Sequence, residues 1–425
     1  MKIIDSSKKN FYKKLDKVIN KRKIVDKLTL KIVEKIIENV RKKQDSALIH
    51  YERKFNYHSK IIPSKKEIRK SIESLDPKIK RVIDEIYKRV KDWHSKQKTK
   101  DIFYRDKLNN KFYYKNKAIE SVACYVPGNL PSSLIMCATP AILAGVKRIV
   151  LCTPSLNGKL NGAVYYAASI LGIKEYYSLS GASAIMALAM GTSKVKAVNK
   201  IVGPGSKWVA LAKKIVFLEG LCGIESANIG PSEILLIADS SADPDIIASS
   251  CIAQNEHSPD SISILLTKDK RLIKKVHLSI TEQLKDLPRR KIANISLKKN
   301  SIFINVSNDK EIISISNYIA PEHIEILTKN YKKYLKSNII AGSVCIGPYS
   351  SMALSDYGPT QHLLPTHSSA KFSSGLSVKD FLTQTSYNEL SKKGVAKFGK
   401  SGYLMSNFEN LVGHSRSIKK RMEKK

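Results

Sequence analysis

The sequence has no long apolar run, and its N-terminus has no apolar core. No stretch approaches the roughly 20 apolar residues of a membrane-spanning helix. Met1–Leu15 carries charged residues throughout, whereas a secretory signal peptide contains an uninterrupted apolar segment. These absences argue against a membrane or secreted protein, so we expect a soluble protein of the cytoplasm.

Cysteine is also scarce. The chain has 6 cysteines in 425 residues, none of them spaced as C-x-x-C, and they lie in apolar surroundings. This pattern predicts buried thiols in a reducing compartment, and it argues against a disulfide framework or a thiolate metal site. The cysteines are Cys124, Cys137, Cys152, Cys222, Cys251 and Cys345.

Acidic residues are few relative to basic ones. Lys and Arg number 74 and Asp and Glu 37, which gives a formal net charge of +37. Such an excess suggests a nucleic-acid partner, but here the basic residues are spread along the whole chain and form no stripe with interleaved aromatics. We therefore assign most of the charge to solvated faces and expect no specific nucleic-acid partner. A polyanion-binding protein is the alternative.

Short apolar strands alternate with helices from Tyr125 onward, which predicts parallel, doubly wound sheets. Before that point, the residues up to about Asn56 and those of Lys66–Lys98 show helical periodicity, and Thr99–Lys117 is expected to be a polar linker. The expected strands lie at about 119–125, 148–152, 175–178, 197–202, 233–239, 261–267, 302–305 and 343–346.

These segments predict an α/β protein with two Rossmann-like doubly wound domains, one inserted in the other, and helical N- and C-terminal extensions. The inserted domain, 125–232, interrupts the first α/β domain, which comprises 25–124 and 233–376. The N-terminal extension is 1–24. The C-terminal extension, 377–425, has too few apolar residues to fold alone, and such tails often dock on a second subunit.

Glu322 and His323 form a candidate acid/base pair. Pro321 has no N–H and disfavours a helical conformation at Ala320, so the backbone is expected to be irregular there. The next residues, Ile324–Leu327, are expected to form a short strand. Histidine titrates near neutrality and a neighbouring carboxylate can be tuned to the same range, which suits proton transfer. Taken alone, such a pair is more often part of a solvated loop.

Four further residues are candidates for a metal site. Gln254 and His257 lie at the end of an expected helix, where positions i and i+3 share a face. Asp356 follows an expected strand, and His414 lies in the C-terminal extension. Two imidazoles, a carboxylate and an amide oxygen suit Zn²⁺ or a neighbouring divalent metal. Spacing alone does not select these four residues from 9 histidines and 37 acidic residues.

The turn Gly203–Ser206 precedes an expected helix and could present backbone N–H groups to an anion. It does not have the G-x-G-x-x-G pattern. Alone, it is weak evidence for a nucleotide.

A set of short motifs follows one order along nearly the whole chain, from about Ile32 to His414. The motifs are Tyr125–Gly128, Gly203–Gly205, Gly230–Glu233, Gln254–Pro259, Ala320–His323, Gly347–Ser350, Asp356–Tyr357, His362–Thr366 and Phe372–Val378. Together they resemble the motifs of the histidinol dehydrogenase family.

The resemblance implies a zinc- and NAD-dependent enzyme. Its catalytic residues would be Glu322 and His323. The implied ligands of one Zn²⁺ per subunit are Gln254, His257, Asp356 and His414. The implied substrate contacts are Ser232, Gln254, His257, His323, Asp356, Glu409 and His414. The implied NAD contacts, on the inserted domain, are Tyr125, Ser183 and Ser206.

The reaction implied is the oxidation of L-histidinol to L-histidine through a bound aldehyde, with two NAD, in the last steps of histidine biosynthesis. His323 would take the proton of the alcohol, and Glu322 would activate the water that hydrates the aldehyde. The resemblance also implies a homodimer in which the C-terminal extension crosses over, so that Glu409 and His414 serve the partner's site.

The sequence departs from the family pattern at three places. The loop after Gly128 is shorter, and Ser183 and Ser206 stand where the family has Gln and Asn. The loop between Asp356 and His362 is one residue shorter, with Gln361 in place of Asn. The first two departures predict weaker NAD binding. A decayed family member that binds polyanions and a zinc hydrolase are the alternatives from other classes.

Overall fold

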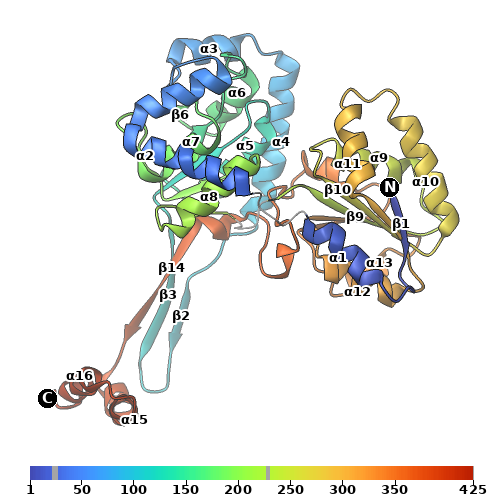
Figure 1. Cartoon of the computed structure of the whole chain (residues 1–425). Coiled ribbons are helices and arrows are strands. Elements are labelled where there is room, and N and C mark those ends of the chain that lie inside the picture. The colour runs from blue at the N-terminus through green and yellow to red at the C-terminus, as the bar shows by residue number, and fades with distance from the viewer. Residues whose placement is uncertain (22–26, 226–229, 425) are drawn as a thin grey trace.

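The computed structural model describes residues 1–21, 27–225 and 230–424, and within them the chain forms two parallel sheets, each covered by helices, and a long antiparallel arm (Figure 1). This arrangement confirms the predicted α/β class with parallel sheets. No helix in the described part of the chain is both long and apolar enough to cross a membrane. All six cysteines are free and buried, as predicted.

The larger sheet has six parallel strands in the order β1-β11-β10-β9-β12-β13. Its strands are β1 (Lys2–Asp5), β9 (Glu233–Ala238), β10 (Ile262–Thr267), β11 (Ile302–Asn305), β12 (His323–Leu327) and β13 (Ser343–Ile346). Its helices are α1 (Phe11–Lys21), α9 (Pro244–Asn255), α10 (Lys270–Gln283), α11 (Arg290–Asn300), α12 (Asp309–Ile319), α13 (Lys332–Leu335) and α14 (Met352–Ser355). Along β9, Leu235 and Ile237 enter one apolar core and Ile234 and Leu236 the other, because successive strand residues face opposite sides.

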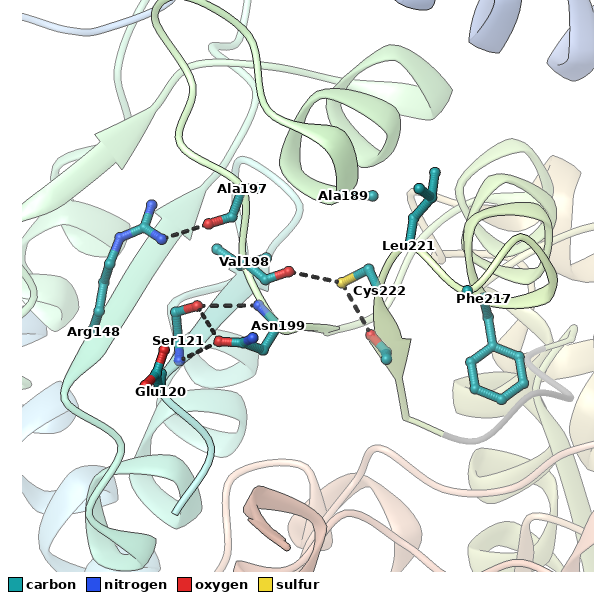
Figure 2. Close-up of a pocket in the computed structure, with 12 residues that line it drawn as sticks. Glu120, Ser121, Arg148, Ala189, Ala197, Val198, Asn199, Phe217, Leu221 and Cys222 are labelled. Atoms are coloured by element: carbon teal, nitrogen blue, oxygen red, sulfur yellow. Dashed lines mark hydrogen bonds between the residues drawn. The ribbon is translucent and has the colours of Figure 1, made fainter. Parts of the chain in front are cut away.

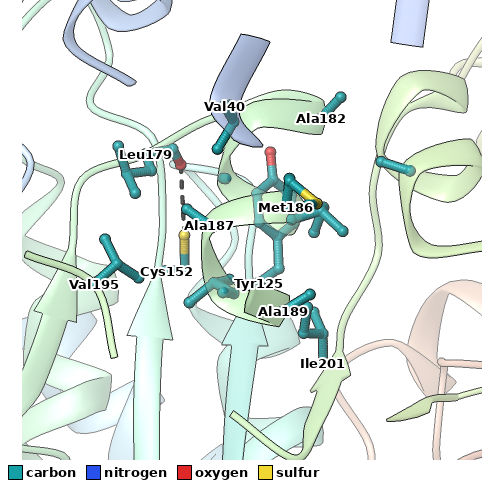
Figure 3. Close-up of a cluster of buried hydrophobic side chains, with 14 of the residues drawn as sticks. Val40, Tyr125, Cys152, Leu179, Ala182, Met186, Ala187, Ala189, Val195 and Ile201 are labelled. Carbon is teal, nitrogen blue, oxygen red and sulfur yellow. Dashed lines mark hydrogen bonds between the residues drawn. The ribbon is translucent and has the colours of Figure 1, made fainter. Parts of the chain in front are cut away.

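The smaller parallel sheet has five strands in the order β6-β5-β4-β7-β8. Its strands are β4 (Ser121–Tyr125), β5 (Arg148–Cys152), β6 (Glu175–Tyr177), β7 (Lys200–Val202) and β8 (Gly223–Ile224). Its helices are α2 (Lys27–Asn56), α3 (Lys65–Glu73), α4 (Pro77–Ser95), α5 (Pro131–Ala144), α6 (Gly162–Ile170), α7 (Gly181–Met190) and α8 (Lys207–Leu218). Figure 3 shows one of its two cores, where Val40 of α2 and Met186 of α7 lie near Tyr125 of β4.

The two parallel sheets share one strand order. If β4 to β8 are numbered 1 to 5, the smaller sheet reads 3-2-1-4-5. If β9 to β13 are numbered in the same way, the larger sheet also reads 3-2-1-4-5, with β1 added beyond β11. In each sheet the order reverses beside the first strand, and the crevice at the carboxyl ends of the strands there is the usual ligand position of open parallel sheets.

The packing corrects the predicted domain boundaries. Residues 25–124 were expected with the first domain, but α2, α3 and α4 pack on the five-stranded sheet and β4 belongs to it. The inserted unit therefore begins near Lys27. The apolar periodicity of a helix predicts that it has a buried face, but not which sheet that face covers.

The N-terminal extension is not entirely helical, because it begins with β1, which pairs in parallel with β11. This strand has only four residues, two of them charged, so it carries no clear local signal. The predicted N-terminal extension also includes residues 22–24, which lie outside the described residues.

The arm is a three-stranded antiparallel sheet in the order β14-β3-β2 that carries two helices at its far end (Figure 1). Its elements are β2 (Ile102–Arg105), β3 (Lys111–Ala118), β14 (Leu382–Glu389), α15 (Lys392–Phe408) and α16 (Val412–Met422). The predicted polar linker is thus a hairpin, and the predicted helical C-terminal extension contains a strand. The pairing of Leu382 with Ala118 joins residues far apart in sequence, so no local pattern reveals it.

Candidate functional site

Apart from Glu409 and His414, the candidate site residues lie where the carboxyl edge of the five-stranded sheet meets the amino edge of the six-stranded sheet. The chain leaves β8 at its carboxyl end and enters β9 at its amino end a few residues later, just after Ser232. Across the same junction, the His362 Nε2 lies 3.2 Å from the hydroxyl of Ser133 in α5. Residues of both parallel sheets can therefore serve one site.

Glu322 lies between α12 and β12, and His323 is the first residue of β12, at the mouth of the predicted strand. Helix α12 ends at Ala320 in a left-handed conformation with φ 44°, and Pro321 then turns the chain into the strand. The neighbouring strand approaches so closely that a Cβ at Gly342 would lie 2.7 Å from the Glu322 carbonyl oxygen. The backbone of the pair is thus held on both sides.

The two side chains are buried, which excludes a solvated loop. Glu322 is 8% exposed and His323 is 4% exposed. The Glu322 Oε2 accepts a hydrogen bond of 2.9 Å from the Glu233 backbone N–H. The other carboxylate oxygen, Oε1, lies 3.8 Å from the His323 Nε2. This backbone bond orients the carboxylate so that one oxygen faces the imidazole.

His323 is a neutral base in this environment. Burial lowers its pKa to about 3, with a further contribution from the nearby imidazoles of His257 and His362. Its Nδ1 is buried and has no hydrogen-bond partner among the described residues. A neutral imidazole with a free nitrogen can accept a proton.

Three of the four predicted metal ligands come from the six-stranded unit. Gln254 is fully buried, and neither its side-chain oxygen nor its nitrogen has a partner within the described parts of the chain. Burial raises the pKa of Asp356 to about 7. His257 is exposed as a residue, yet the protein around its side chain desolvates the imidazole enough to lower its pKa. Its Nδ1 lies 3.4 Å from the Ser232 hydroxyl.

The fourth predicted metal ligand, His414, and the predicted substrate contact Glu409 lie elsewhere. Glu409 follows α15 and His414 lies in α16, at the far end of the arm and away from both parallel sheets (Figure 1). Among residues 1–21, 27–225 and 230–424, no three His, Cys, Asp or Glu side chains form a metal-binding group. A single chain therefore does not bring the four predicted ligands together, and their shared role stays a prediction.

His362 is a polar residue of the site that the sequence reasoning did not select. Its Nδ1 lies 3.3 Å from the carbonyl oxygen of Asp356, and a carbonyl can only accept, so Nδ1 carries the proton. Burial lowers the pKa of His362 to about 4, so Nε2 accepts from the Ser133 hydroxyl. His362 begins the motif His362–Thr366, but nothing in its spacing indicated a role.

The predicted NAD residues lie at the carboxyl edge of the five-stranded sheet. Tyr125 ends β4, and its hydroxyl accepts a 3.1 Å hydrogen bond from the Gly181 N–H. Ser183 lies in the first turn of α7, where it is buried and donates to the Ser180 carbonyl oxygen at 2.9 Å. Ser206 precedes α8 and is exposed. The three residues thus lie at or after the ends of three different strands, at one edge of the sheet.

Within the described residues, three of the helices that begin at this edge lack a bond from their N-cap side chain, although the Gly181 N–H at the start of α7 donates to the Tyr125 hydroxyl. In the described chain, α5, α7 and α8 have no hydrogen bond from an N-cap side chain to their first turn. The turn before α8 is tight, because a Cβ at Gly203 would lie 1.9 Å from the Tyr125 carbonyl oxygen. Open helix N-termini beside a tight turn provide N–H groups for an anion such as a pyrophosphate.

A cavity of about 760 Å³ lies at the opposite, amino edge of the same sheet (Figure 2). Its polar side chains bond to one another and to the backbone. Ser121 bonds to Asn199, and Arg148 donates to the Ala197 carbonyl oxygen. It contains none of the predicted site residues and belongs to the other end of the strands.

Comparison with known proteins decides the family. A family model described as histidinol dehydrogenase matches residues 19–422. The chain belongs to the histidinol dehydrogenase family. Histidinol dehydrogenase of Pelagibacter ubique is 50% identical over 429 residues and covers 100% of both chains. Histidinol dehydrogenase 1 of a Nostoc species is 35% identical and covers 100% of this chain and 99% of its own.

The fold agrees with this membership. The crystal structure of histidinol dehydrogenase from Elizabethkingia anophelis has a TM-score of 0.92 at 31% identity, and the match covers 100% of this chain and 98% of that chain. As a member of the histidinol dehydrogenase family, the chain is an oxidoreductase of histidine biosynthesis that acts on histidinol. The alternatives, a polyanion-binding protein and a zinc hydrolase, are not favoured.

Proposed function

We propose that the chain oxidises L-histidinol to L-histidine through the bound aldehyde in two successive steps, with two NAD and one Zn²⁺ per subunit. The observation that carries the proposal is the buried Glu322–His323 pair, whose 3.8 Å separation and neutral imidazole suit proton transfer. His323 takes the proton of the alcohol in the first oxidation. Glu322 then activates the water that hydrates the aldehyde before the second.

The residues of the six-stranded unit fit a zinc ion. Gln254 has a buried amide oxygen without a partner in the described chain, and Asp356 has a carboxylate whose charge is disfavoured by burial. A bound cation would coordinate the amide oxygen and stabilise the charged form of the carboxylate. Gln254, His257 and Asp356 would hold the ion together with His414, and the ion would orient the substrate beside His323.

The five-stranded unit fits NAD, which accepts the hydride. We treat the two parallel sheets as Rossmann-like domains, each with the order 3-2-1-4-5, and assign the cofactor to the carboxyl edge of the smaller one. Tyr125, Ser183 and Ser206 would line that crevice. The absence of an N-cap side-chain bond at the starts of α5, α7 and α8 in the described chain supports this assignment.

The position of the arm supports a homodimer in which each site is shared. Helix α15 leaves Leu404 68%, Met405 56% and Phe408 84% exposed in the single chain, and a second subunit would cover them. Glu409 directly follows Phe408, and His414 lies in α16, which packs on α15, and both would reach the partner's site. The six buried free thiols support a reducing compartment, the cytoplasm.

The proposal is tested by NADH formation from L-histidinol by the zinc-loaded enzyme, with and without a chelator. We expect about two NADH per histidinol consumed, in line with two hydride transfers, and loss of activity on zinc removal that added zinc restores. Formation of one NADH per histidinol with release of the aldehyde would contradict the second step.

Sharing of the site has its own test. The inactive variants His257→Ala and His414→Ala, mixed and re-associated, should regain part of the activity, because one site of the heterodimer receives a complete ligand set. Recovery no greater than in the unmixed variants would mean that His414 serves its own chain.

A further inference from the structure

Beneath the turn that follows β7, a lysine and a glutamate are buried together. Lys213 of α8 is 0% exposed, and the Glu225 side chain, just after β8, is 8% exposed. The Lys213 Nζ donates to the Glu225 Oε1 at 2.5 Å and to the Gly203 carbonyl oxygen at 2.6 Å. The Glu225 Oε1 also accepts from the Gly203 N–H at 3.1 Å.

The pair therefore holds both polar groups of one residue, Gly203. This residue has φ 123°, a conformation that side chains rarely adopt, and it passes directly over the Tyr125 carbonyl oxygen. It is the point at which the chain leaves β7 and turns toward the N-terminus of α8. Lys213 and Glu225 thus fix the orientation of the peptide groups that begin the turn.

A purely structural role does not explain an ion pair at this position. Removing two charges from water costs several kcal/mol per ion, and apolar side chains of similar size often stabilise a core equally well. What an apolar pair cannot do is hold an N–H and a carbonyl of one glycine at the same time. The geometry is therefore suited to orient a turn.

We propose that Lys213 and Glu225 are positioning residues for NAD, because they set the turn Gly203–Gly205, which leads into α8, in the orientation that receives the cofactor. The inference rests on the proposed use of this edge by NAD. Neither residue needs to touch the cofactor, since both act through Gly203.

A similar arrangement at the other end of β7 provides a matched control. Arg148 of β5 pairs with Glu175 at 2.8 Å and donates to the Ala197 carbonyl oxygen at 2.6 Å, just before β7 (Figure 2). Like the Lys213–Glu225 pair, this arrangement joins a cation, a carboxylate and a backbone carbonyl. It lies at the amino edge of the sheet, away from the proposed cofactor crevice.

The experiment compares the zinc-loaded full-length enzyme with Lys213→Met, Glu225→Gln, the double variant and Arg148→Met. NAD binding is measured by calorimetric titration without histidinol, together with Tm, zinc content and the KM for each substrate. Each single variant leaves one buried charge unpaired and should lose stability, whereas the double variant removes both charges and should recover part of it.

We expect the double variant to bind NAD about ten-fold more weakly, because its turn is no longer pre-organised. Its KM for histidinol and its zinc content should stay at the wild-type values. Arg148→Met should lower Tm and leave NAD binding unchanged. A folded double variant that binds NAD within about two-fold of the wild type would overturn the inference alone. A wild-type enzyme that does not bind NAD would overturn the proposed function and the inference with it.

Discussion

The two parallel sheets have the same strand order, but their candidate ligand sites lie at opposite edges of the sheet. In the six-stranded unit, three of the helices that begin at the carboxyl edge are capped by side chains, Asp243 on α9, Asp269 on α10 and Asn308 on α12, whereas the short helix α13 after β12 has no such cap among the described residues. Asp239, at the end of β9, also accepts a hydrogen bond from the Lys329 N–H after β12, across the point where the strand order reverses. At this point the chain's own carboxylate therefore takes a backbone N–H of the neighbouring segment.

The five-stranded unit is the reverse case. Its helices α5, α7 and α8 begin without a side-chain cap in the described chain, and only α6 among those after its strands has one, from Asn161. The comparison teaches that strand order fixes where a crevice forms, whereas the capping residues decide whether it is free to bind a ligand. In the six-stranded sheet, the candidate catalytic residues Glu322 and His323 lie at the opposite, amino edge.

The largest expected effect on activity comes from changing the catalytic pair at the amino edge of the six-stranded sheet. His323→Asn should lower kcat for histidinol by about 10²–10⁴-fold, because the base of the first step is lost. Glu322→Gln should still form the aldehyde but hydrate it slowly. Supplying the aldehyde directly separates the two roles, and normal aldehyde turnover by Glu322→Gln would show that this carboxylate does not activate the water.

The turn at the open carboxyl edge should be intolerant of a side chain. Gly203→Ala should lower the free energy of unfolding by more than about 3 kcal/mol, because the Cβ meets a backbone oxygen and φ is positive. Gly172→Ala is the control, since Gly172 also has positive φ, +72°, but no atom within 4 Å of the added Cβ. It should cost about 1 kcal/mol. Urea unfolding of both variants checks this, and equal losses would mean that the close approach is unimportant.

NAD affinity should respond to the exposed residue at the start of α8. Ser206→Asn supplies an amide where a short hydroxyl now stands, and should tighten NAD by about two- to ten-fold, one hydrogen bond of roughly 0.5–1.5 kcal/mol. The buried Ser183 already bonds to the Ser180 carbonyl, so Ser183→Gln should give a smaller gain. Titration at two salt concentrations measures the change, with histidinol affinity as the control. Weaker binding by Ser206→Asn would mean that the shortened loop has rebuilt the crevice.

The smallest effect distinguishes capped from uncapped helices. Asp243→Ala and Asp269→Ala should each cost about 1 kcal/mol of unfolding free energy, because each removes a side-chain cap. Ser206→Ala should cost much less, because Ser206 makes no such bond. A similar loss in all three variants would remove the distinction between the edges.

The sequence predicted the parts of the molecule whose signals are local. Pro321 and the apolar run after it indicated the turn and strand of the Glu322–His323 pair, and the alternation of short strands and helices indicated two parallel sheets. The sheet on which α2 packs, the strand β1 and the arm depend on contacts between distant residues, which no short window contains.

The same limit applies to the site. His362 and Lys213 became visible only through contacts with Ser133 and Gly203, which come from other elements of the fold. Glu409 was predicted from the resemblance alone, and His414 was a candidate metal ligand that spacing did not select. Their contribution to a site needs a second chain and remains a prediction.

Amide hydrogen exchange of the zinc-loaded enzyme tests most directly whether the two sheets use opposite edges. NAD should protect the segments 126–134, 181–185 and 203–210, at the carboxyl edge of the five-stranded sheet, and histidinol should protect 230–233 and 321–324, at the amino edge of the six-stranded sheet. The first turns of α9, α10 and α12 should exchange at unchanged rates with either ligand. Protection of those turns by NAD, with none at 203–210, would contradict the account.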